Sequence, residues 1–433
     1  MRLWIAALTG LAVLLPLPAA AAIIGHMSPA EPLTETRIAL LPKAQQAPWL
    51  AYLARSRALM TADKAALADE RAGMAAPPPA ASGPSGGGGM PLDRPASWYA
   101  GAEARHVADN ILSFQTPAGG WGKNQDRSGP ARLRGQAWVA EDHAPASARP
   151  ELAAEGEGWS YVGTIDNNAT TSELAFLARV QAPFPGAEGE PYRAAFVRGL
   201  RYLLTAQFPN GGWPQVYPLQ GGYHDALTYN DDALGRVVGL LAEVAGRAGD
   251  YGFVPADLAA TAKAAQARAV DVILRTQIVI RGKRTIWAQQ YDALTLAPAG
   301  ARNFEPAALS ATESGDLLVL LMRQPSPNPA VRAAIEAGIF WISDHQLLDL
   351  AWTRVGARGR ILLVTKGAGP IWSRYYDLAT EQPIFGDRDK SIHDDVMELS
   401  LERRNGYSWY NSGPARALKA YEKWRARLGA GGK

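Results

Sequence analysis

The chain has 433 residues and 47% hydrophobic content, enough to bury the core of one large domain or two ordinary ones. Its 44 Lys and Arg and 41 Asp and Glu leave a formal charge of +3, so the composition does not indicate a nucleic-acid-binding protein. There is no cysteine, and none of the six histidines forms a metal-type pair. The composition therefore argues against disulfides, a thiol nucleophile, a zinc centre and a Ser/His/Asp triad.

The first 22 residues have the composition of an export signal. Met1 and Arg2 supply a positive start, residues 5–17 are apolar, and residues 19–22 are small alanines suited to cleavage. No other stretch approaches the ~20 apolar residues that a membrane-spanning helix needs. We therefore expect a secreted or periplasmic monomer with no membrane association after signal removal.

Two segments precede the main domain. Residues 23–74 are expected to form a helical extension, with helix from Pro42 to about Met74. Residues 75–96 are rich in Ala, Pro, Ser and Gly, a composition typical of a flexible linker or loop. The main domain is assigned to residues 97–433.

The main domain contains a repeated pattern. Residues 115–121 read Gln-Thr-Pro-Ala-Gly-Gly-Trp, residues 207–213 read Gln-Phe-Pro-Asn-Gly-Gly-Trp, and residues 277–287 are a longer version that ends at Trp287. Acidic or amide residues follow each tryptophan and open an apolar helix, at residues 165–168, 229–232 and 311–314. Repeated helix-loop-helix units bury one another's apolar faces and collect their loops at one end. The pattern predicts a mostly helical, double-layered ring with its polar site in those loops.

The loops contain hard oxygen ligands, fixed positive charges and aromatic rings. Asp166, Asp231 and Asp232 are suited to Ca²⁺, although carboxylates at helix starts are equally suited to capping. Residues able to hold carboxylates are Lys123, Arg302, Arg388, Arg403 and Arg404. Candidate stacking faces for sugar rings are Trp121, Trp213, Tyr291, Tyr407 and Trp409, of which Trp121 and Trp213 are better suited to wedging the repeat loops together.

Such a cleft would suit a polyuronate. Removing the proton beside a carboxylate builds negative charge on a group that is already anionic. Bound divalent metal and guanidinium groups would stabilise that charge, and the glycosidic oxygen one carbon further would then leave. The reaction is a β-elimination, in which no water acts as the nucleophile.

At these residues the chain resembles the family 10 polysaccharide lyases, the pectate or pectic acid lyases. The likeness covers about residues 97–410, in stretches at residues 119–124, 164–170, 211–218, 221–225, 229–233, 287–292, 301–306, 383–389 and 402–410. It implies an all-α (α/α) toroid with little β structure and Ca²⁺-dependent cleavage of polygalacturonate. By the same resemblance, Asp166 and one of Asp231 or Asp232 bind the metal. Arg302 abstracts the C5 proton and Arg388 binds a substrate carboxylate, while the remaining residues in cleft-lining motifs are Lys123, Asn167, Arg404 and Tyr407.

The base assignment has a physical difficulty, because free arginine has a pKa above ~12. If burial and nearby cations do not lower the Arg302 pKa, Arg302 would only stabilise charge, and Lys123 or a metal-bound hydroxide would take the proton. The chain departs from the family pattern at Gly122, Phe304 and Lys390, none of which is a proposed ligand. Two alternatives remain: an inverting glycoside hydrolase acting on uronate-containing glycans through Asp166 and Asp231 or Asp232, and a non-catalytic glycan-binding protein.

Overall fold

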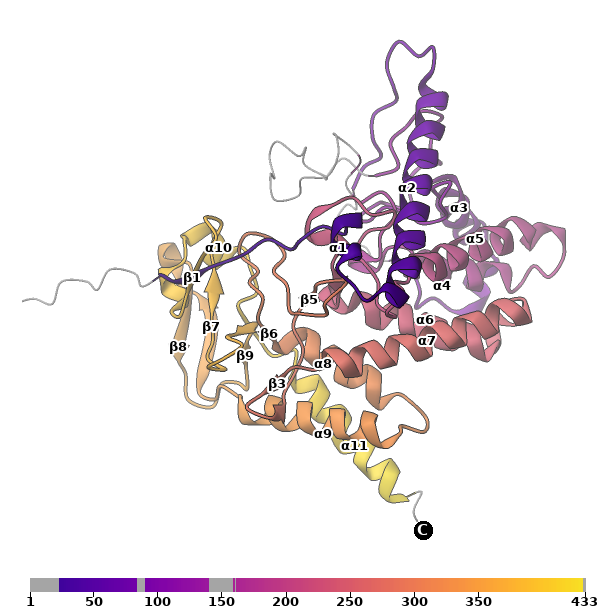
Figure 1. Cartoon of the computed structure of the whole chain (residues 1–433). Coiled ribbons are helices and arrows are strands. Elements are labelled where there is room, and N and C mark those ends of the chain that lie inside the picture. The colour runs from indigo at the N-terminus through magenta and orange to yellow at the C-terminus, as the bar shows by residue number, and fades with distance from the viewer. Residues whose placement is uncertain (1–22, 84–89, 140–158, 160, 431–433) are drawn as a thin grey trace, which may run out of the picture.

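The structure is a computed structural model that describes residues 23–83, 90–139, 159 and 161–430. The predicted export signal lies outside the described residues, so export stays a prediction. None of the helices in the described part of the chain combines the length and apolar character that crossing a bilayer requires. Figure 1 shows most of the long helices on one side of the molecule and most of the short strands on the opposite side.

The main domain consists of two layers of helices. The outer layer contains α3 (Ala102–Ser113), α5 (Glu190–Ala206), α7 (Ala256–Thr276) and α9 (Pro329–Asp344). The inner layer contains α4 (Thr171–Gln181), α6 (Ala233–Gly246), α8 (Ala311–Met322) and α11 (Ala415–Ala430). Within a layer, α4 packs on α6 and α6 on α8, as α5 does on α7 and α7 on α9. Contacts between layers join α4 to α5, α6 to α7 and α8 to α9. This arrangement confirms the predicted double-layered helical toroid.

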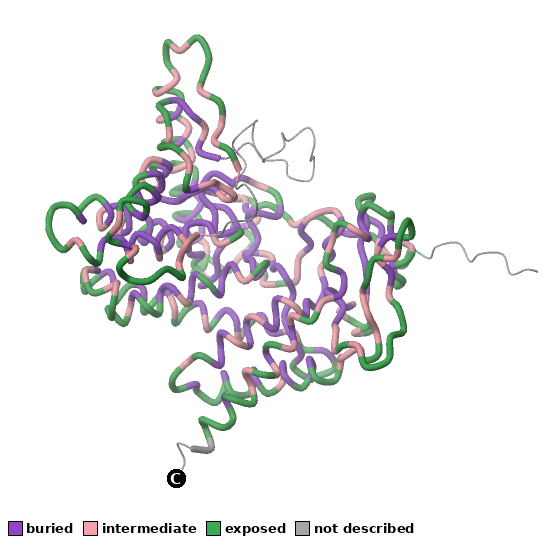
Figure 2. Tube along the Cα trace, turned by 180° about the vertical axis from the view of Figure 1, so that it is seen from behind, coloured by how far each residue is buried: buried purple, intermediate pink, exposed green. Residues whose placement is uncertain are grey.

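Inner and outer helices differ in how far their sides are buried. In α8, Leu317, Leu318 and Leu321 are at most 2% exposed, and the helix is apolar almost all round because neighbours cover it on both sides. The outer α7 is amphipathic, with Ala262, Ala269 and Val272 buried and a charged opposite face. Figure 2 shows this pattern, with buried segments along the facing sides of the helices and exposed segments at the rim.

A buried tryptophan anchors each unit between its outer and inner helix. The indole N–H donates to a backbone carbonyl of the preceding outer helix, at 2.7 Å from Trp121 to Ile111, 2.7 Å from Trp213 to Leu203 and 2.7 Å from Trp287 to Ile273. All three indoles are fully buried. They wedge the loops against the helices, as predicted for Trp121 and Trp213.

The structure contains a fourth unit that the sequence pattern did not reveal. Trp372 is fully buried, and its indole N–H donates to the carbonyl of Ile342 in α9 at 2.8 Å. Small strands fill the chain between Trp372 and α11, and the Gln-to-Trp motif is absent from this stretch of sequence. The unit can therefore be recognised only from its packing.

Trp121 and Trp213 are each preceded by two glycines, and close packing of the loop requires the first glycine of each pair. Gly119 has φ +106° and Gly211 has φ +102°, a region that L side chains rarely adopt. A Cβ at Gly211 would lie 2.3 Å from the Arg268 carbonyl oxygen, and one at Gly119 would lie 2.8 Å from that of Arg198. The loop therefore passes too close to the outer helix for any side chain.

Strands in the described residues are short and antiparallel. Two-residue strands pair as β2 (Leu227–Thr228) with β5 (Gln290–Tyr291), β3 (Val279–Ile280) with β4 (Lys283–Arg284), β6 (Leu309–Ser310) with β10 (Tyr375–Tyr376), and β9 (Trp372–Ser373) with β13 (Tyr410–Asn411). A hairpin joins β7 (Leu350–Arg354) and β8 (Arg360–Val364), so the apolar run near residue 361 is a strand. A three-stranded sheet places β12 (Ser391–His393) between β1 (Ile23–His26) and β11 (Phe385–Gly386). The short helix α10 (Leu401–Asn405) follows this sheet.

The N-terminal extension packs on the toroid. It contains α1 (Glu35–Ala39) and α2 (Lys43–Arg71), close to the helix predicted from the sequence. Trp49 and Tyr52 pack against Phe208, and the Tyr52 hydroxyl donates to the Ala206 carbonyl at 3.0 Å. The segment expected to be a linker also contacts the main domain where it is described, since the Pro79 carbonyl accepts from Gln136 at 2.8 Å.

Candidate active site

A small polar pocket of about 120 Å³ is lined by the connections that run from the outer helices to the inner helices. Its lining includes five residues that the sequence singled out: Lys123, Asp166, Asn167, Asp231 and Arg302. They come from the first three repeat units, with Arg302 in the loop after β5 of the third unit. The fold thus brings together residues that are far apart in the chain.

Asp166 and Lys123 form a buried ion pair at one side of the pocket. Lys123 Nζ contacts Asp166 Oδ2 and lies 3.5 Å from the centroid of the Tyr161 ring. Asp166 is 4% exposed. Burial acts to raise the pKa of Asp166, but the charge and hydrogen bond of Lys123 outweigh it, so the pKa is lowered. In turn, the Asp166 charge outweighs burial and raises the pKa of Lys123.

The acidic helix starts of the first two units have the same backbone. Asn167 (φ 48°, ψ 37°) and Asp231 (φ 48°, ψ 38°) are both left-handed, a conformation that Asn and Asp tolerate better than most residues. Before each of them, a threonine hydroxyl accepts a backbone N–H, Thr164 from Asp166 at 3.0 Å and Thr228 from Asn230 at 3.2 Å. Asn167 and Asp231 are therefore equivalent positions, and both line the pocket.

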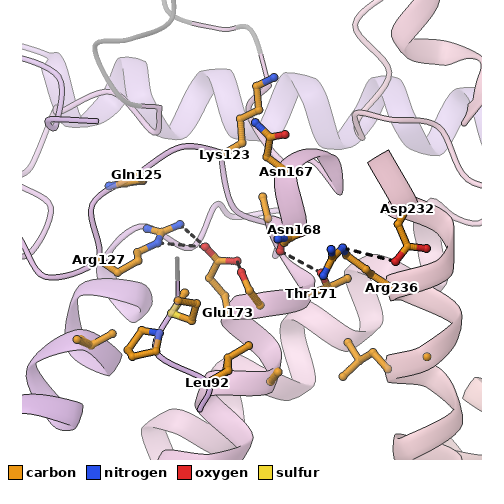
Figure 3. Close-up of a pocket in the computed structure, with 18 of the residues that line it drawn as sticks. Leu92, Lys123, Gln125, Arg127, Asn167, Asn168, Thr171, Glu173, Asp232 and Arg236 are labelled. Carbon is orange, nitrogen blue, oxygen red and sulfur yellow. Dashed lines mark hydrogen bonds and ion pairs between the residues drawn. The ribbon is translucent and has the colours of Figure 1, made fainter. Parts of the chain in front are cut away.

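The two neighbouring aspartates of the second unit point to different places. Asp231 lines the small pocket, and its Oδ1 lies 3.5 Å from Nη2 of the buried Arg374. Asp232 lines a larger cavity of about 910 Å³ beside it and lies 3.9 Å from Nε of Arg236. Figure 3 shows Asp232 and Arg236 on one side of this cavity, away from Lys123 and Asn167. Of the two aspartates, only Asp231 is placed to share a ligand with Asp166.

Helix capping by side chains does not explain why acidic residues stand before the inner helices. Asp232 occupies the N-cap of α6 and Ser310 that of α8, yet neither side chain accepts a first-turn N–H. The N-cap of α4 is Thr170, so Asp166 does not take the capping position of the first inner helix.

Arg302 also lines the pocket and is held by Glu305. Its Nε donates to Glu305 Oε2 at 2.9 Å and its Nη2 to Oε1 at 2.5 Å, a two-pronged pair. The Tyr407 hydroxyl donates to Glu305 Oε1 at 2.6 Å. Although burial opposes it, the Arg302 charge lowers the pKa of Glu305 to about 2, and Glu305 raises the pKa of Arg302 well above its usual value. Without a ligand, this pair favours protonated Arg302.

Three guanidinium groups surround the Phe304 ring, at 4.8 Å for Arg302, 5.5 Å for Arg388 and 4.0 Å for Arg403. The Arg388 guanidinium also pairs with the exposed carboxylate of Glu402, at 2.9 Å. Desolvation and the charges of Arg388 and Arg302 lower the pKa of Arg403, against the opposing effect of Glu402. These cations form a wall suited to carboxylates.

Arg404 does not join this wall. Its guanidinium donates to the carbonyls of Met397 at 3.1 Å and Arg358 at 2.8 Å. Consecutive residues of a helix project about 100° apart, so Arg403 and Arg404 of α10 cannot face the same way. Arg403, and not Arg404, is the residue of this pair that lies with Arg302 at the Phe304 ring.

A hydrogen-bonded network runs from Tyr407 to Asn230 through Tyr375 and Gln289, two residues for which the sequence predicted no role. Tyr407 contacts the Tyr375 hydroxyl at 2.7 Å, Tyr375 donates to Gln289, and Gln289 donates to Asn230. Buried Arg374 pairs with Glu313 at 2.5 Å and lies beside Asp231. The sequence did contain a signal for part of this set, because the residues two positions after the four tryptophans that anchor the units are Lys123, Gln215, Gln289 and Arg374.

Most of the expected stacking aromatics are inaccessible. Tyr291 is 1% exposed and Trp409 is fully buried, so the prediction that they offer faces to sugar rings is wrong. Tyr407 is partly exposed, and its ring lies within 5.7 Å of the Arg302 guanidinium and 4.9 Å of that of Arg374. Its hydroxyl donates to Glu305, which lines the pocket, so Tyr407 belongs to the hydrogen-bonded network beside the pocket.

The side-chain oxygen atoms around the pocket could supply part of the coordination shell of a hard cation. No group of three His, Cys, Asp or Glu side chains with metal-binding geometry occurs among the described residues. Gln215 and Gln290 line the same pocket as Asp166 and Asp231. The buried Oε1 atoms of these two glutamines have no hydrogen-bond partner. Ca²⁺ takes six to eight oxygen ligands, so these four residues would fit it once a ligand and water completed the shell.

Comparison with known proteins gives a consistent result. Residues 115–418 match the model of the pectic acid lyase family. The structure is similar to that of a family 10 polysaccharide lyase from Cellvibrio cellulosa, with 31% identity, a TM-score of 0.62, and coverage of 76% of this chain and 96% of the other. It is also similar to an aspartate-to-alanine mutant of a family 10 polysaccharide lyase from the same organism in complex with trigalacturonic acid. That match has 30% identity, a TM-score of 0.63, and coverage of 76% and 97%. No curated protein matches the chain.

Proposed function

The chain belongs to the pectic acid lyase family and is a polysaccharide lyase, and we propose that it cleaves polygalacturonate by β-elimination as a calcium-dependent pectate lyase. The observation that carries this proposal is the shared pocket, which Arg302 lines together with the carboxylates of Asp166 and Asp231. The trigalacturonic acid complex of a family member supports the substrate class.

The cationic wall supplies the electrostatics of the elimination. Removing the C5 proton of a galacturonate places negative charge on a carbon beside a carboxylate. Arg388 and Arg403 lie near Arg302 around the Phe304 ring and would hold substrate carboxylates through fixed, always-charged donors. Their preorganisation lowers the barrier because the charges need not move when the transition state forms.

Calcium would bind between Asp166, Asp231 and the two glutamine oxygens. When bound to a substrate carboxylate, it would neutralise charge and increase the acidity of the adjacent C5 proton. Lys123 holds the Asp166 carboxylate ionised, the form that a metal ligand requires. Asp232 is left out of this set, because its carboxylate lines the larger cavity with Arg236.

Arg302 is assigned as the residue that takes the C5 proton. Its side chain is 37% exposed in the pocket, whereas that of Lys123 is 12% exposed and is paired to Asp166. Because Glu305 favours protonated Arg302, proton abstraction requires that their pair loosen when substrate binds. The Tyr407 hydroxyl would continue to satisfy Glu305 in that state.

The test is an ultraviolet assay with polygalacturonate. Elimination leaves a conjugated unsaturated uronate, so the wild type should produce a rising absorbance that a chelator abolishes and added Ca²⁺ restores. Arg302→Ala should lose turnover by about a hundredfold or more while it still binds oligogalacturonate. Products without the unsaturated signature would identify a hydrolase, and unchanged turnover in Arg302→Ala would remove Arg302 from the mechanism.

A further inference from the structure

We propose that the N-terminal segment of residues 23–37, here called the N-terminal strap, positions the loop that presents Arg302. The strap lies outside the family match, which begins at residue 115. The inference rests on the proposed role of Arg302. Three separate contacts tie the strap to the two arginine-bearing loops.

The first contact is a strand pairing beside Arg388. Strand β1 pairs with β12 in the register Gly25 to Ile392 and His26 to Ser391. The Met27 N–H then donates to the Lys390 carbonyl at 2.8 Å. The turn that carries Arg388 connects β11 and β12, so the strap forms the third strand of the sheet that supports this turn. Asn303 Nδ2 donates to the Arg388 carbonyl at 3.1 Å, which links that turn to the Arg302 loop.

The second contact is a close crossing at Gly300, two residues before Arg302. A Cβ at Gly300 would lie 2.8 Å from the Ser28 carbonyl oxygen, 3.0 Å from Met27 Sδ and 3.2 Å from the Glu305 carbonyl oxygen. The loop is therefore enclosed between the strap and its own far side. Met27 is 5% exposed, and Ala30 packs against the small apolar cluster of Tyr223 and Ala301.

The third contact is an ion pair at the start of the same loop. Arg37 Nη2 donates to Asp292 Oδ2 at 2.6 Å, while its Nε contacts the Glu31 carboxylate at 2.8 Å. The other oxygen of Asp292 accepts the backbone N–H groups of Leu294 and Thr295, at 3.0 and 2.8 Å, and so shapes the turn. The side chains of Arg37 and Asp292 are 19% and 14% exposed, so the pair is partly shielded from water.

The strap thus holds the Arg302 loop at two points. One is Asp292 at the start of the loop, and the other is Gly300, two residues before Arg302. Misplacement of a catalytic group by ~1 Å can cost about a hundredfold in rate. A loop on the surface of a rigid scaffold is otherwise among the more mobile parts of a protein. Arg37 is therefore a positioning residue that acts through Arg302 without contacting substrate.

The test compares Arg37→Ala with Arg57→Ala in the full chain. Arg57 is a matched control because it pairs with Glu35 within the extension, where both side chains are exposed. In Arg37→Ala, amide hydrogen exchange of residues 292–305 should quicken about tenfold, the effect of losing one charge-assisted hydrogen bond. Its kcat on polygalacturonate should fall about tenfold or more while the affinity for trigalacturonate is kept. Arg57→Ala should change neither quantity, and Arg37→Lys should restore part of both.

Equal exchange of residues 292–305 in the two alanine variants would overturn the proposal. So would a loss of trigalacturonate affinity in Arg37→Ala with no fall in kcat. Failure of the proposed function gives a different result, because the wild type would then make no unsaturated product while the exchange of residues 292–305 would still respond to Arg37→Ala.

Discussion

Replacing Glu305 by Gln is the sharpest probe of the pocket, because it keeps the shape of the side chain and removes only its charge. Glu305 is 2% exposed and accepts three hydrogen bonds from Arg302, two from its guanidinium and one from its backbone N–H, and one from Tyr407. In the variant, Arg302 keeps its positive charge but loses its counter-ion. The change therefore tests both the folding contribution of the pair and its control of the Arg302 pKa.

The magnitude follows from the pKa of the carboxyl group. A drop from an ordinary 4.5 to about 2 corresponds to about 3 kcal/mol of folding free energy. Because the folded pKa is the lower one, this stability is present above about pH 4.5 and is lost as the pH falls toward 2. Glu305→Gln should therefore be about 3 kcal/mol less stable than the wild type at neutral pH, and the gap should close in acid.

The assay is urea unfolding of both proteins at several pH values between about 7 and 3. Glu402→Gln is the matched control, since Glu402 also pairs with an arginine but lies at the surface, where such pairs contribute less than about 1 kcal/mol. The variant should also extend lyase activity to lower pH. Loss of Glu305 lowers the Arg302 pKa, so a base at this position is deprotonated at lower pH.

Two results would refute this reasoning. A stability gap that stays constant from neutral to acid pH would show that Glu305 is not held ionised by Arg302. An unchanged acid limb of the kcat profile, in a variant that does show the closing gap, would show that the proton is taken by a group other than Arg302.

Other predictions concern neighbouring residues. Asp231→Asn should raise the Ca²⁺ concentration needed for half-maximal activity about tenfold or more, and Asp232→Asn should leave it near the wild-type value; equal effects would contradict the assignment. Burial raises the pKa of Asp63 to about 7, so Asp63→Asn should be more stable than the wild type by up to about 4 kcal/mol near pH 8, with no difference near pH 4, in thermal or urea unfolding. Arg403→Ala should lower kcat/KM about tenfold or more, whereas Arg404→Ala should mainly reduce stability by about 1–3 kcal/mol; a reversed pattern would contradict the orientation of α10.

The helical fold could be predicted because its signals are local. A buried tryptophan, a glycine pair forced by close packing and an apolar stripe all lie within one repeat unit. The fourth unit and the strap could not be predicted in this way. Trp372 is separated from its inner helix by several short strands, and β1 pairs with a strand more than three hundred residues away. Contacts between segments so far apart in the chain form only when the rest of the domain has folded, so no local sequence pattern indicates them.

For the candidate site, the sequence indicated residue types and regions, but not the direction of each side chain. Asp231 and Asp232 are adjacent, and the left-handed φ of both residues decides which carboxylate faces the pocket. The helical phase of α10 decides in the same way between Arg403 and Arg404. These choices are set by backbone angles that residue composition does not fix, so identical neighbours can have unrelated environments.

The four tryptophans explain how a pocket made of loops can be rigid enough for this chemistry. Each indole is fixed to an outer helix by its own N–H bond, and the residue two positions later lies at the site: Lys123, Gln215, Gln289 or Arg374. The charged side chains occur in the first and last units, where each pairs with a buried carboxylate, and the two amides lie between them. Each of these four polar side chains therefore lies in a connection that is fixed to a packed helix two residues earlier. A buried ammonium–carboxylate pair such as Lys123–Asp166 is stable only when its geometry is fixed in this way.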